Sequence, residues 1–233
     1  MACSIKDQTD QSHAAPGLHG VEQLVLSRDF IEWLRGFTDG EGSFIIVKGK
    51  GNVFSFKFRI GLHLDDKGAL ENIHNTLRLG KVTVNQVSGE ARFTVNTQRE
   101  IAVIIAIFSK YNLNTTKHLN FLAFARAYWL YMDNNSLEAR KELKPVIEDI
   151  ISGMNSKRID FNLSPTHYKI TTNWLLGFVE ADGWFSFSIN ERYFSLGIIQ
   201  KCNKAFFEAI QYFLHNLASQ RFAELGLGWF AGR

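Results

Sequence analysis

The fold is decided by a stretch that occurs twice: residues 33–44 read WLRGFTDGEGSF and residues 174–185 read WLLGFVEADGWF. Aligned without gaps, both copies have Trp, Leu, Gly, Phe, Gly and Phe at matching positions, and acid lies opposite acid at Asp39/Glu180 and at Glu41/Asp182. The segments that follow also correspond, since FRIGL (58–62) resembles FSLGI (194–198). A match of this detail at domain-length separation indicates a tandem duplication.

Each copy is predicted to be an α+β unit. In the first, Ser27 is a candidate N-cap, and apolar residues at helical spacing predict a helix that ends at Gly40 and Gly42. Residues 54–63 alternate apolar and polar side chains, which predicts a half-buried strand with one basic face. A helix to Leu79, a hairpin with arms 81–87 and 91–95, and helices over 99–111 and 116–133 follow. We therefore expect helices packed on one face of an antiparallel sheet.

The expected divisions are a flexible leader (1–26), a first repeat (27–133), a linker (134–170) and a second repeat (171–233). The linker is predicted to be helical and charged over 137–155, with an interruption near Pro145. The second repeat is predicted to have strands over 184–189 and 193–200 and a helix over 204–217. It is expected to be truncated, because the second hairpin and terminal helices of the first repeat have no counterpart in it.

Composition excludes several classes of protein. Among 233 residues, 45% are hydrophobic, 21% are charged and three are Pro, which is typical of a folded chain. The longest apolar run, residues 101–108, is far shorter than the roughly 20 residues that cross a bilayer, so no membrane partner is expected. Two cysteines and scattered histidines do not have zinc-site spacing, and any metal is expected to be held by oxygen. The net charge of +3 permits a polyanionic partner without demanding one.

The small residues of the repeated stretch predict close helix packing. Gly36 and Gly40 lie four residues apart, as do Gly177 and Ala181, so each pair shares one helix face. Because these faces lack bulk, the two helices are expected to approach closely and to bring their C-terminal ends together.

That packing would place Glu41 and Asp182 side by side. Two carboxylates at the negative ends of helix dipoles repel each other unless a cation binds between them. Mg²⁺ prefers one or two carboxylates plus water and phosphate oxygens, so the pair predicts a Mg²⁺ site suited to displacement at phosphorus. Asp39 and Glu180 are expected instead to be structural and to bond backbone at the helix ends.

The repeated motifs resemble those of the LAGLIDADG homing endonucleases, specifically the single-chain members with two fused repeats. The motifs are residues 34–42 (LRGFTDGEG) and 175–183 (LLGFVEADG), and the resemblance extends through residues 54–128 and 154–158. It implies two tandem αββαββα half-domains in a pseudo-twofold arrangement, with antiparallel DNA-binding sheets over the major groove and, here, an incomplete second half.

The resemblance also implies functional roles. Glu41 and Asp182 would hold divalent metal and direct water at one scissile phosphate per strand, giving a staggered double-strand cut. Lys117 looks like the basic catalytic residue of the family. Adding the motif offset of 141 to 117 gives 258, so no counterpart is expected in the second repeat.

Polar side chains on the predicted sheet faces are candidates for DNA contact, because Arg and Lys suit guanine edges or phosphates and Asn suits adenine. A solvated sheet face would show the same alternation. The candidates are Lys48, Lys57, Arg59, His63, Lys81, Thr83, Asn85, Arg92, Thr94 and Asn96 in the first repeat, and Ser186, Ser188, Asn190, Arg192 and Lys201 in the second.

Three functions fit these observations. The first is an intron-encoded, sequence-specific, Mg²⁺-dependent double-strand DNA endonuclease that acts as a monomer. The second is a maturase that binds its group I intron RNA, and the third is an inactive truncated product. Retention of Glu41 and Asp182 favours the nuclease, because an RNA chaperone does not need metal-binding carboxylates. The resemblance implies an organelle-encoded, mitochondrial protein.

Overall fold

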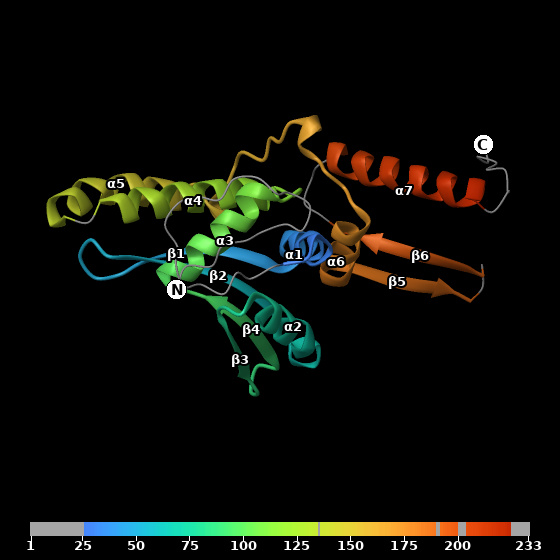
Figure 1. Cartoon of the computed structure of the whole chain (residues 1–233), viewed down its shortest axis with the longest axis horizontal. Coiled ribbons are helices and arrows are strands. Elements are labelled where there is room, and N and C mark those ends of the chain that lie inside the picture. Colours follow the sequence, from blue (N-terminus) through green and yellow to red (C-terminus); the bar gives the residue numbers. More distant parts are fainter. Residues whose placement is uncertain (1–25, 135, 190–191, 200–203, 225–233) are drawn as a thin grey trace.

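The computed structural model describes residues 26–134, 136–189, 192–199 and 204–224 (Figure 1). The expected leader therefore lies outside the described residues except for its last position. Within the described ranges, no helix has the length and apolar character that spanning a membrane requires.

The first repeat alternates helices with pairs of strands. Its first helix begins where the sequence predicts, because the Ser27 hydroxyl accepts a hydrogen bond from the Phe30 amide at 3.2 Å. In chain order the elements are α1 (Arg28–Glu41), β1 (Gly42–Lys48), β2 (Phe54–His63), the short helix η1 (Leu64–Asp66), α2 (Lys67–Leu77), β3 (Lys81–Asn85), β4 (Glu90–Val95), α3 (Gln98–Lys110) and α4 (Lys117–Asp133).

The four strands form one antiparallel sheet in the order β1-β2-β4-β3. Phe44 pairs with Phe58, and Phe58 pairs in turn with Val95, so these side chains share one face of the sheet. Helices α3 and α4 cover that face, and the rings of Phe108 and Phe121 lie 5.9 and 5.5 Å from the ring of Phe44. The predicted α+β class, with helices on one sheet face, is confirmed.

The linker contains α5 (Leu137–Ser152) and two short helices, η2 (Asn155–Lys157) and η3 (Pro165–His167). The predicted interruption near Pro145 is wrong, since α5 continues through it. Proline removes one backbone hydrogen bond, and the residue whose carbonyl loses that bond, Lys141, is exposed to solvent. Water can therefore replace the missing donor.

Within the described residues, the second repeat has α6 (Thr172–Asp182), β5 (Gly183–Ser188), β6 (Tyr193–Ile198) and α7 (Lys204–Glu224). Strands β5 and β6 form a separate antiparallel pair, in which Phe185 lies opposite Leu196. Since Phe44 lies opposite Phe58 in the first repeat, Leu196 is the counterpart of Phe58. The sequence comparison aligns Phe58 with residue 194, whereas strand pairing aligns it with residue 196, so the two alignments differ by two residues.

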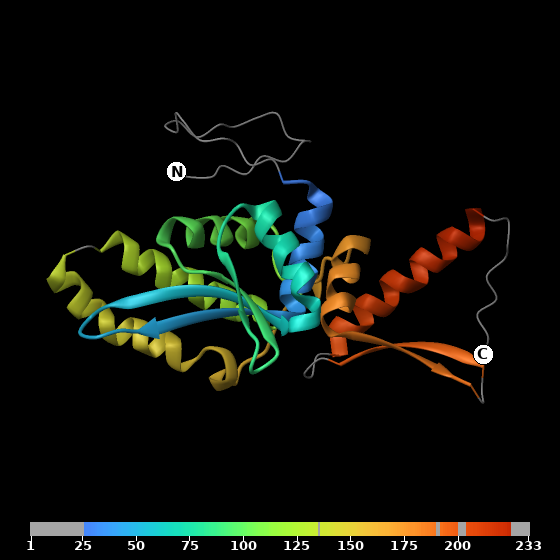
Figure 2. The same ribbon diagram turned by 90° about the horizontal axis from the view of Figure 1, so that it is seen from below.

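Helices α1 and α6 lie side by side and join the two repeats (Figures 1 and 2). The sheets extend away from this helix pair in opposite directions (Figure 2). The pair therefore forms the centre of the pseudo-twofold arrangement, and the C-terminal end of each helix leads directly into the first strand of its own repeat.

Candidate active site between the two repeats

The contact between α1 and α6 includes two places where a glycine of one helix lies against the backbone of the other. A Cβ atom added at Gly36 would overlap the carbonyl oxygen of Trp174, and one added at Gly177 would overlap the carbonyl oxygen of Trp33. The two contacts are related by the internal repeat. Each glycine therefore allows the opposite helix to approach more closely than any side chain would permit.

The second small pair lies one turn further along. A Cβ atom at Gly40 would overlap the Cβ of Ala181 and would lie 3.4 Å from the carboxyl carbon of Asp182. The Asp182 carboxylate thus lies against the end of α1, next to the residue that precedes Glu41. The packing places the last acid of each motif at the same point between the repeats.

The environment of Glu41 raises the pKa of its carboxyl group. Burial is the main cause, and the negative charge of Asp182 adds to it, while the positive charge of Lys117 acts in the opposite direction. A divalent cation bound between the two carboxylates would stabilise the charged form of Glu41 and offset the repulsion from Asp182. Two neighbouring carboxylates supply only oxygen ligands, which fits a hard cation such as Mg²⁺. Glu41 also lines an open cavity of about 700 Å³, together with Glu180 and His63, which leaves room for a ligand beside this carboxylate.

Lys117 reaches the same region from the first residue of α4. Its Nζ donates hydrogen bonds to the carbonyl oxygens of Gly40 and, at 3.5 Å, Thr38 at the end of α1. Burial lowers the pKa of Lys117, and the negative charges of Asp39, Asp182 and Glu41 oppose that effect. A partly buried ammonium group therefore lies near the two carboxylates.

Asp39 and Glu180 contact the other repeat. Asp39 is fully buried and accepts a hydrogen bond from the indole of Trp174 at 2.8 Å, as well as bonds from the loop before α4. Glu180 accepts one from the indole of Trp33 at 2.7 Å. The sequence aligns both tryptophans, but we assigned them no role. The sequence feature that points to this exchange is a Trp six residues before an acid in both copies of the motif.

Most candidate DNA-contacting residues lie on one face of the first sheet. Strand pairing puts them on the face opposite Phe58, because Lys57, Arg59 and His63 alternate with Phe58 along β2 and the register aligns the candidates on β3 and β4 with this polar set. These residues are Lys57, Arg59, His63, Lys81, Thr83, Asn85, Arg92 and Thr94. Asn96 is exposed immediately after β4. Arg92 donates to Glu90 on the same face at 2.6 Å.

Lys48 departs from the expected set. It pairs with Phe54, so its side chain lies on the helix-covered face, where it forms an ion pair with Glu148 of α5 at 2.5 Å. The register of β1 therefore directs Lys48 away from the other candidates. We exclude it from the proposed DNA-contacting surface.

In the second repeat, Ser186 pairs with Ser195 and their hydroxyl oxygens lie 2.5 Å apart, while Ser188 pairs with Tyr193. Arg192 lies in the turn between β5 and β6 with a positive φ of 55°. The remaining two candidates, Asn190 and Lys201, lie outside the described residues.

Comparison with known proteins is consistent with this geometry. The family model described as LAGLIDADG endonuclease matches residues 34–128. The Saccharomyces cerevisiae protein named "Uncharacterized mitochondrial protein RF1" is 30% identical over 162 residues, which cover 69% of this chain and 33% of that protein. The Schizosaccharomyces pombe protein named "Probable intron-encoded endonuclease Cox1-I1b" is 30% identical over 162 residues, covering 67% and 41%. This chain thus spans between a third and about two fifths of the length of these relatives.

Solved structures give the same result. The LAGLIDADG homing endonuclease I-GzeII, in complex with its DNA target, aligns with a TM-score of 0.58 and 28% identity over 71% of this chain and 64% of that one. The LAGLIDADG homing endonuclease I-LtrWI, bound to its target DNA, aligns with a TM-score of 0.57 and 26% identity over 67% and 59%.

Proposed function

Because this chain belongs to the LAGLIDADG endonuclease family, we propose that it is a sequence-specific endonuclease that hydrolyses phosphodiester bonds of double-stranded DNA. The observation that carries the proposal is the juxtaposition of Glu41 and Asp182. Two closely packed helices bring these carboxylates together near the partly buried Lys117.

Glu41 and Asp182 would hold Mg²⁺. Their support is the raised pKa of the Glu41 carboxyl, since burial and the negative charge of Asp182 disfavour its charged form more than the nearby Lys117 favours it. When bound, such an ion supplies Lewis-acid activation of the phosphodiester. The open cavity that Glu41 lines would leave room for a phosphate group beside this carboxylate.

Lys117 is proposed to stabilise the negative charge that develops on the phosphate as water attacks. The new P–O bond forms to the water oxygen, which gives up a proton to solvent, while the bond to the leaving oxygen breaks and the leaving oxygen takes up a proton from solvent. An ammonium group in a partly buried site is effective in this role because less water screens its charge than at the surface. The hydrogen bonds to Thr38 and Gly40 hold the ammonium near Glu41.

The polar face of the first sheet is the proposed DNA-contacting surface. Its cations, among them Lys57, Arg59 and Lys81, would contact phosphates and guanine edges, while Asn85 would contact adenine. The two repeats lie in one polypeptide, so we propose that a monomer binds one target site. Its target is proposed to be the intronless allele of its host gene, since the Schizosaccharomyces pombe relative is named as intron-encoded. Its location is proposed to be mitochondrial, since the Saccharomyces cerevisiae relative is named as a mitochondrial protein.

The test uses the full 233-residue chain and a supercoiled plasmid that carries the intronless exon junction. With Mg²⁺ we expect linear plasmid, and with EDTA no cleavage. Glu41→Gln should abolish cleavage, whereas Glu148→Gln, the same substitution at the ion pair on α5, should preserve it. Cleavage by Glu41→Gln would refute the assignment. Binding of the host intron RNA with intact plasmid would instead favour the maturase alternative.

A further inference from the structure

We propose that Trp174, a residue of the second repeat, positions Lys117 of the first repeat by holding Asp39 and the loop that precedes α4. The inference rests on the proposed nuclease function and adds to it a specific residue in the opposite repeat. It makes the second repeat a structural part of the first repeat's active site.

The first link is between Trp174 and Asp39. The indole Nε1 donates to Oδ2 of Asp39 at 2.8 Å, and neither residue is accessible to solvent. A buried carboxylate requires donors, because without them its desolvation is costly. Trp174 supplies one of these donors from across the repeat interface.

The second link is between Asp39 and the loop. The amides of Asn114 and Thr115 donate to its two carboxylate oxygens at 2.8 Å each, and the Thr115 hydroxyl donates at 2.6 Å. One carboxylate thus binds two consecutive amides and a hydroxyl group. The loop is held at a fixed distance from α1.

The third link is between the loop and Lys117. The Thr115 hydroxyl oxygen accepts a hydrogen bond from the Lys117 amide at 3.3 Å, at the start of α4. The Lys117 side chain then reaches back to the carbonyls of Thr38 and Gly40, which flank Asp39. The hydrogen bonds therefore form a closed circuit, and a shift of Asp39 would displace the ammonium group.

Trp174 is itself rigidly placed. Its ring stacks on Phe178 with a centroid distance of 5.0 Å, and its carbonyl lies where Gly36 lacks a side chain. A second tie runs nearby, because the Asn114 side chain exchanges hydrogen bonds with the backbone of Lys169, just before α6. The loop is thus held at two points, by Trp174 of the second repeat and by Lys169 at the end of the linker.

The pseudo-symmetric pair offers a matched control. Trp33 donates to Glu180 at 2.7 Å, but this bond lies at the surface. Among the described residues, no loop amide donates to Glu180. Removing the Trp33 donor should therefore disturb the interface without loosening the loop that carries Lys117.

The kinetic experiment compares Trp174→Phe with Trp33→Phe in the full chain, using the plasmid described above under single-turnover conditions with saturating protein. For Trp174→Phe we expect the cleavage rate to fall by about 100-fold, as a misplacement of about 1 Å can cause. The Kd for the exon-junction duplex should stay within about twofold, because the sheet face is unaltered. Trp33→Phe should lower the rate by less than about threefold. Equal rate losses, or a Trp174→Phe loss caused by weaker binding, would overturn the proposal.

Amide hydrogen exchange gives a readout that needs no cleavage. Trp174→Phe should speed exchange at Asn114 and Thr115 by about tenfold, the size expected when one buried hydrogen bond is lost, whereas Trp33→Phe should not. Thr115→Val removes a hydrogen bond to Asp39 without altering the interface between the repeats, and it should lower the cleavage rate as Trp174→Phe does. This variant keeps the test available if Trp174→Phe does not fold. Unchanged exchange in Trp174→Phe, or an unchanged rate in Thr115→Val, would refute the coupling. If the wild-type chain leaves DNA intact while exchange still responds to Trp174→Phe, the proposed function fails and the structural coupling stands.

Discussion

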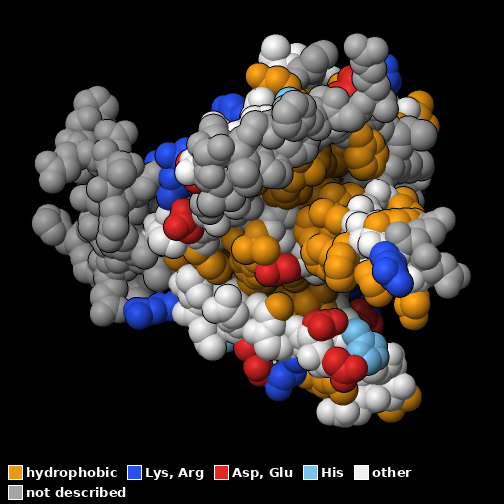
Figure 3. Space-filling model, turned by 90° about the vertical axis from the view of Figure 1, so that its right-hand side faces the viewer, with side chains coloured by type: hydrophobic (Ala, Val, Ile, Leu, Met, Phe, Trp, Pro, Cys, Tyr) orange, Lys and Arg blue, Asp and Glu red, His pale blue; other side chains and the backbone are white. Residues whose placement is uncertain are grey.

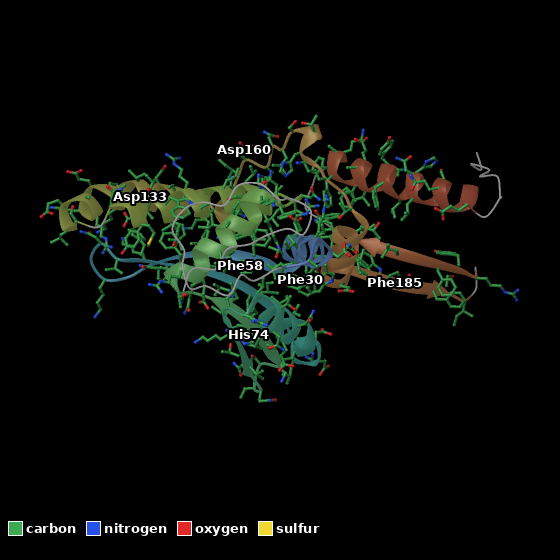
Figure 4. All side chains as sticks on the ribbon, in the orientation of Figure 1. Phe30, Phe58, His74, Asp133, Asp160 and Phe185 are labelled. Carbon is green, nitrogen blue, oxygen red and sulfur yellow. The ribbon has the colours of Figure 1, made fainter. Side chains whose placement is uncertain are left out.

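The two repeats place the same residue in opposite environments. Phe44 and Phe185 occupy the same position of the duplicated motif, yet the first is 1% exposed and the second 76%. Figure 4 labels Phe58, the strand neighbour of Phe44, between the sheet and its covering helices, and Phe185 on the β5–β6 hairpin. The motif therefore determines the strand and its face, while burial depends on a second layer of helices encoded elsewhere.

The ring contacts explain the difference. In the first repeat, the ring of Phe44 lies within 6 Å of aromatic rings from both α3 and α4. In the second, Phe187 and Phe194 contact each other across the hairpin at 4.6 Å but remain more than half exposed. Figure 3 shows hydrophobic side chains gathered on this end of the molecule. Helix packing, not strand composition, separates the two environments.

Substitutions at Phe44 and Phe185 test the difference between the two repeats most directly. Phe44→Ala should lower the free energy of unfolding by about 4 kcal/mol, because it leaves a cavity in a packed core. Phe185→Ala should change it by less than about 0.5 kcal/mol, because the ring is exposed. Urea denaturation followed by circular dichroism measures both values. Similar losses would mean that the face of β5 is covered in solution.

The helix interface gives the next largest effect. Gly36→Ala should destabilise the chain by about 3 kcal/mol, because its methyl group would overlap the backbone of α6. Gly177→Ala should have a matching effect, since it forms the reciprocal contact.

Gly68→Ala is the control for the interface, because no atom lies within 4 Å of the added methyl group. It should be neutral or slightly stabilising, since alanine favours a helix over glycine. Thermal unfolding of the Gly36→Ala, Gly177→Ala and Gly68→Ala variants measures whether the two interface substitutions destabilise the chain more than the control does. A tolerated Gly36→Ala would contradict the backbone contact between the repeats.

Acid should weaken the first repeat through His118, the second residue of α4. Burial lowers its pKa from 6.5 to about 4, and the nearby His167 adds to the effect. The unfolded chain takes up a proton near pH 6.5 and the folded chain only near pH 4. The contribution of neutral His118 to the free energy of unfolding is therefore fully present above pH 6.5. It is lost as the pH falls toward 4, by about 2 to 3 kcal/mol.

The control for this pH dependence is His118→Gln, which cannot titrate. Its unfolding free energy should depend less on pH between 6.5 and 4 than that of the wild-type chain. Parallel curves for the two proteins would assign the acid sensitivity to other groups.

The smallest effect is expected at the end of β1. Lys48 pairs with Glu148, whereas the motif offset places Ile189 at the corresponding position of the second repeat, where it is 79% exposed. Lys48→Ile makes the first repeat resemble the second there and should lower the free energy of unfolding by less than any substitution above except the controls, because both charges are partly exposed. The loss should shrink in high salt. A salt-independent loss would indicate that the contact is not electrostatic.

The sequence predicts local features well where the pattern is periodic. Alternation over 54–63 identifies β2 and its buried face, and Ser27 marks the start of α1. The first hairpin arm ends at Asn85 instead of 87, because the Asn85 side chain accepts the amides of Val87 and Ser88 and starts the turn.

Other features depend on distant parts of the chain. Residues 44–47 are all apolar, so no alternation shows which face of β1 carries Lys48. The link from Trp174 to Asp39 joins residues 135 positions apart and requires the packed helix pair. The spacing of small residues predicts that helix pair but not the hydrogen bonds that cross it.

The crossed indole–carboxylate bonds bear on how such a chain can originate. Each motif contains both members of the exchange, an indole donor and an acid acceptor six residues later. A single ancestral repeat could therefore satisfy both bonds by pairing with an identical molecule. Fusion of two copies into one chain would then need no new contact at the interface between the repeats, only a linker long enough to connect them.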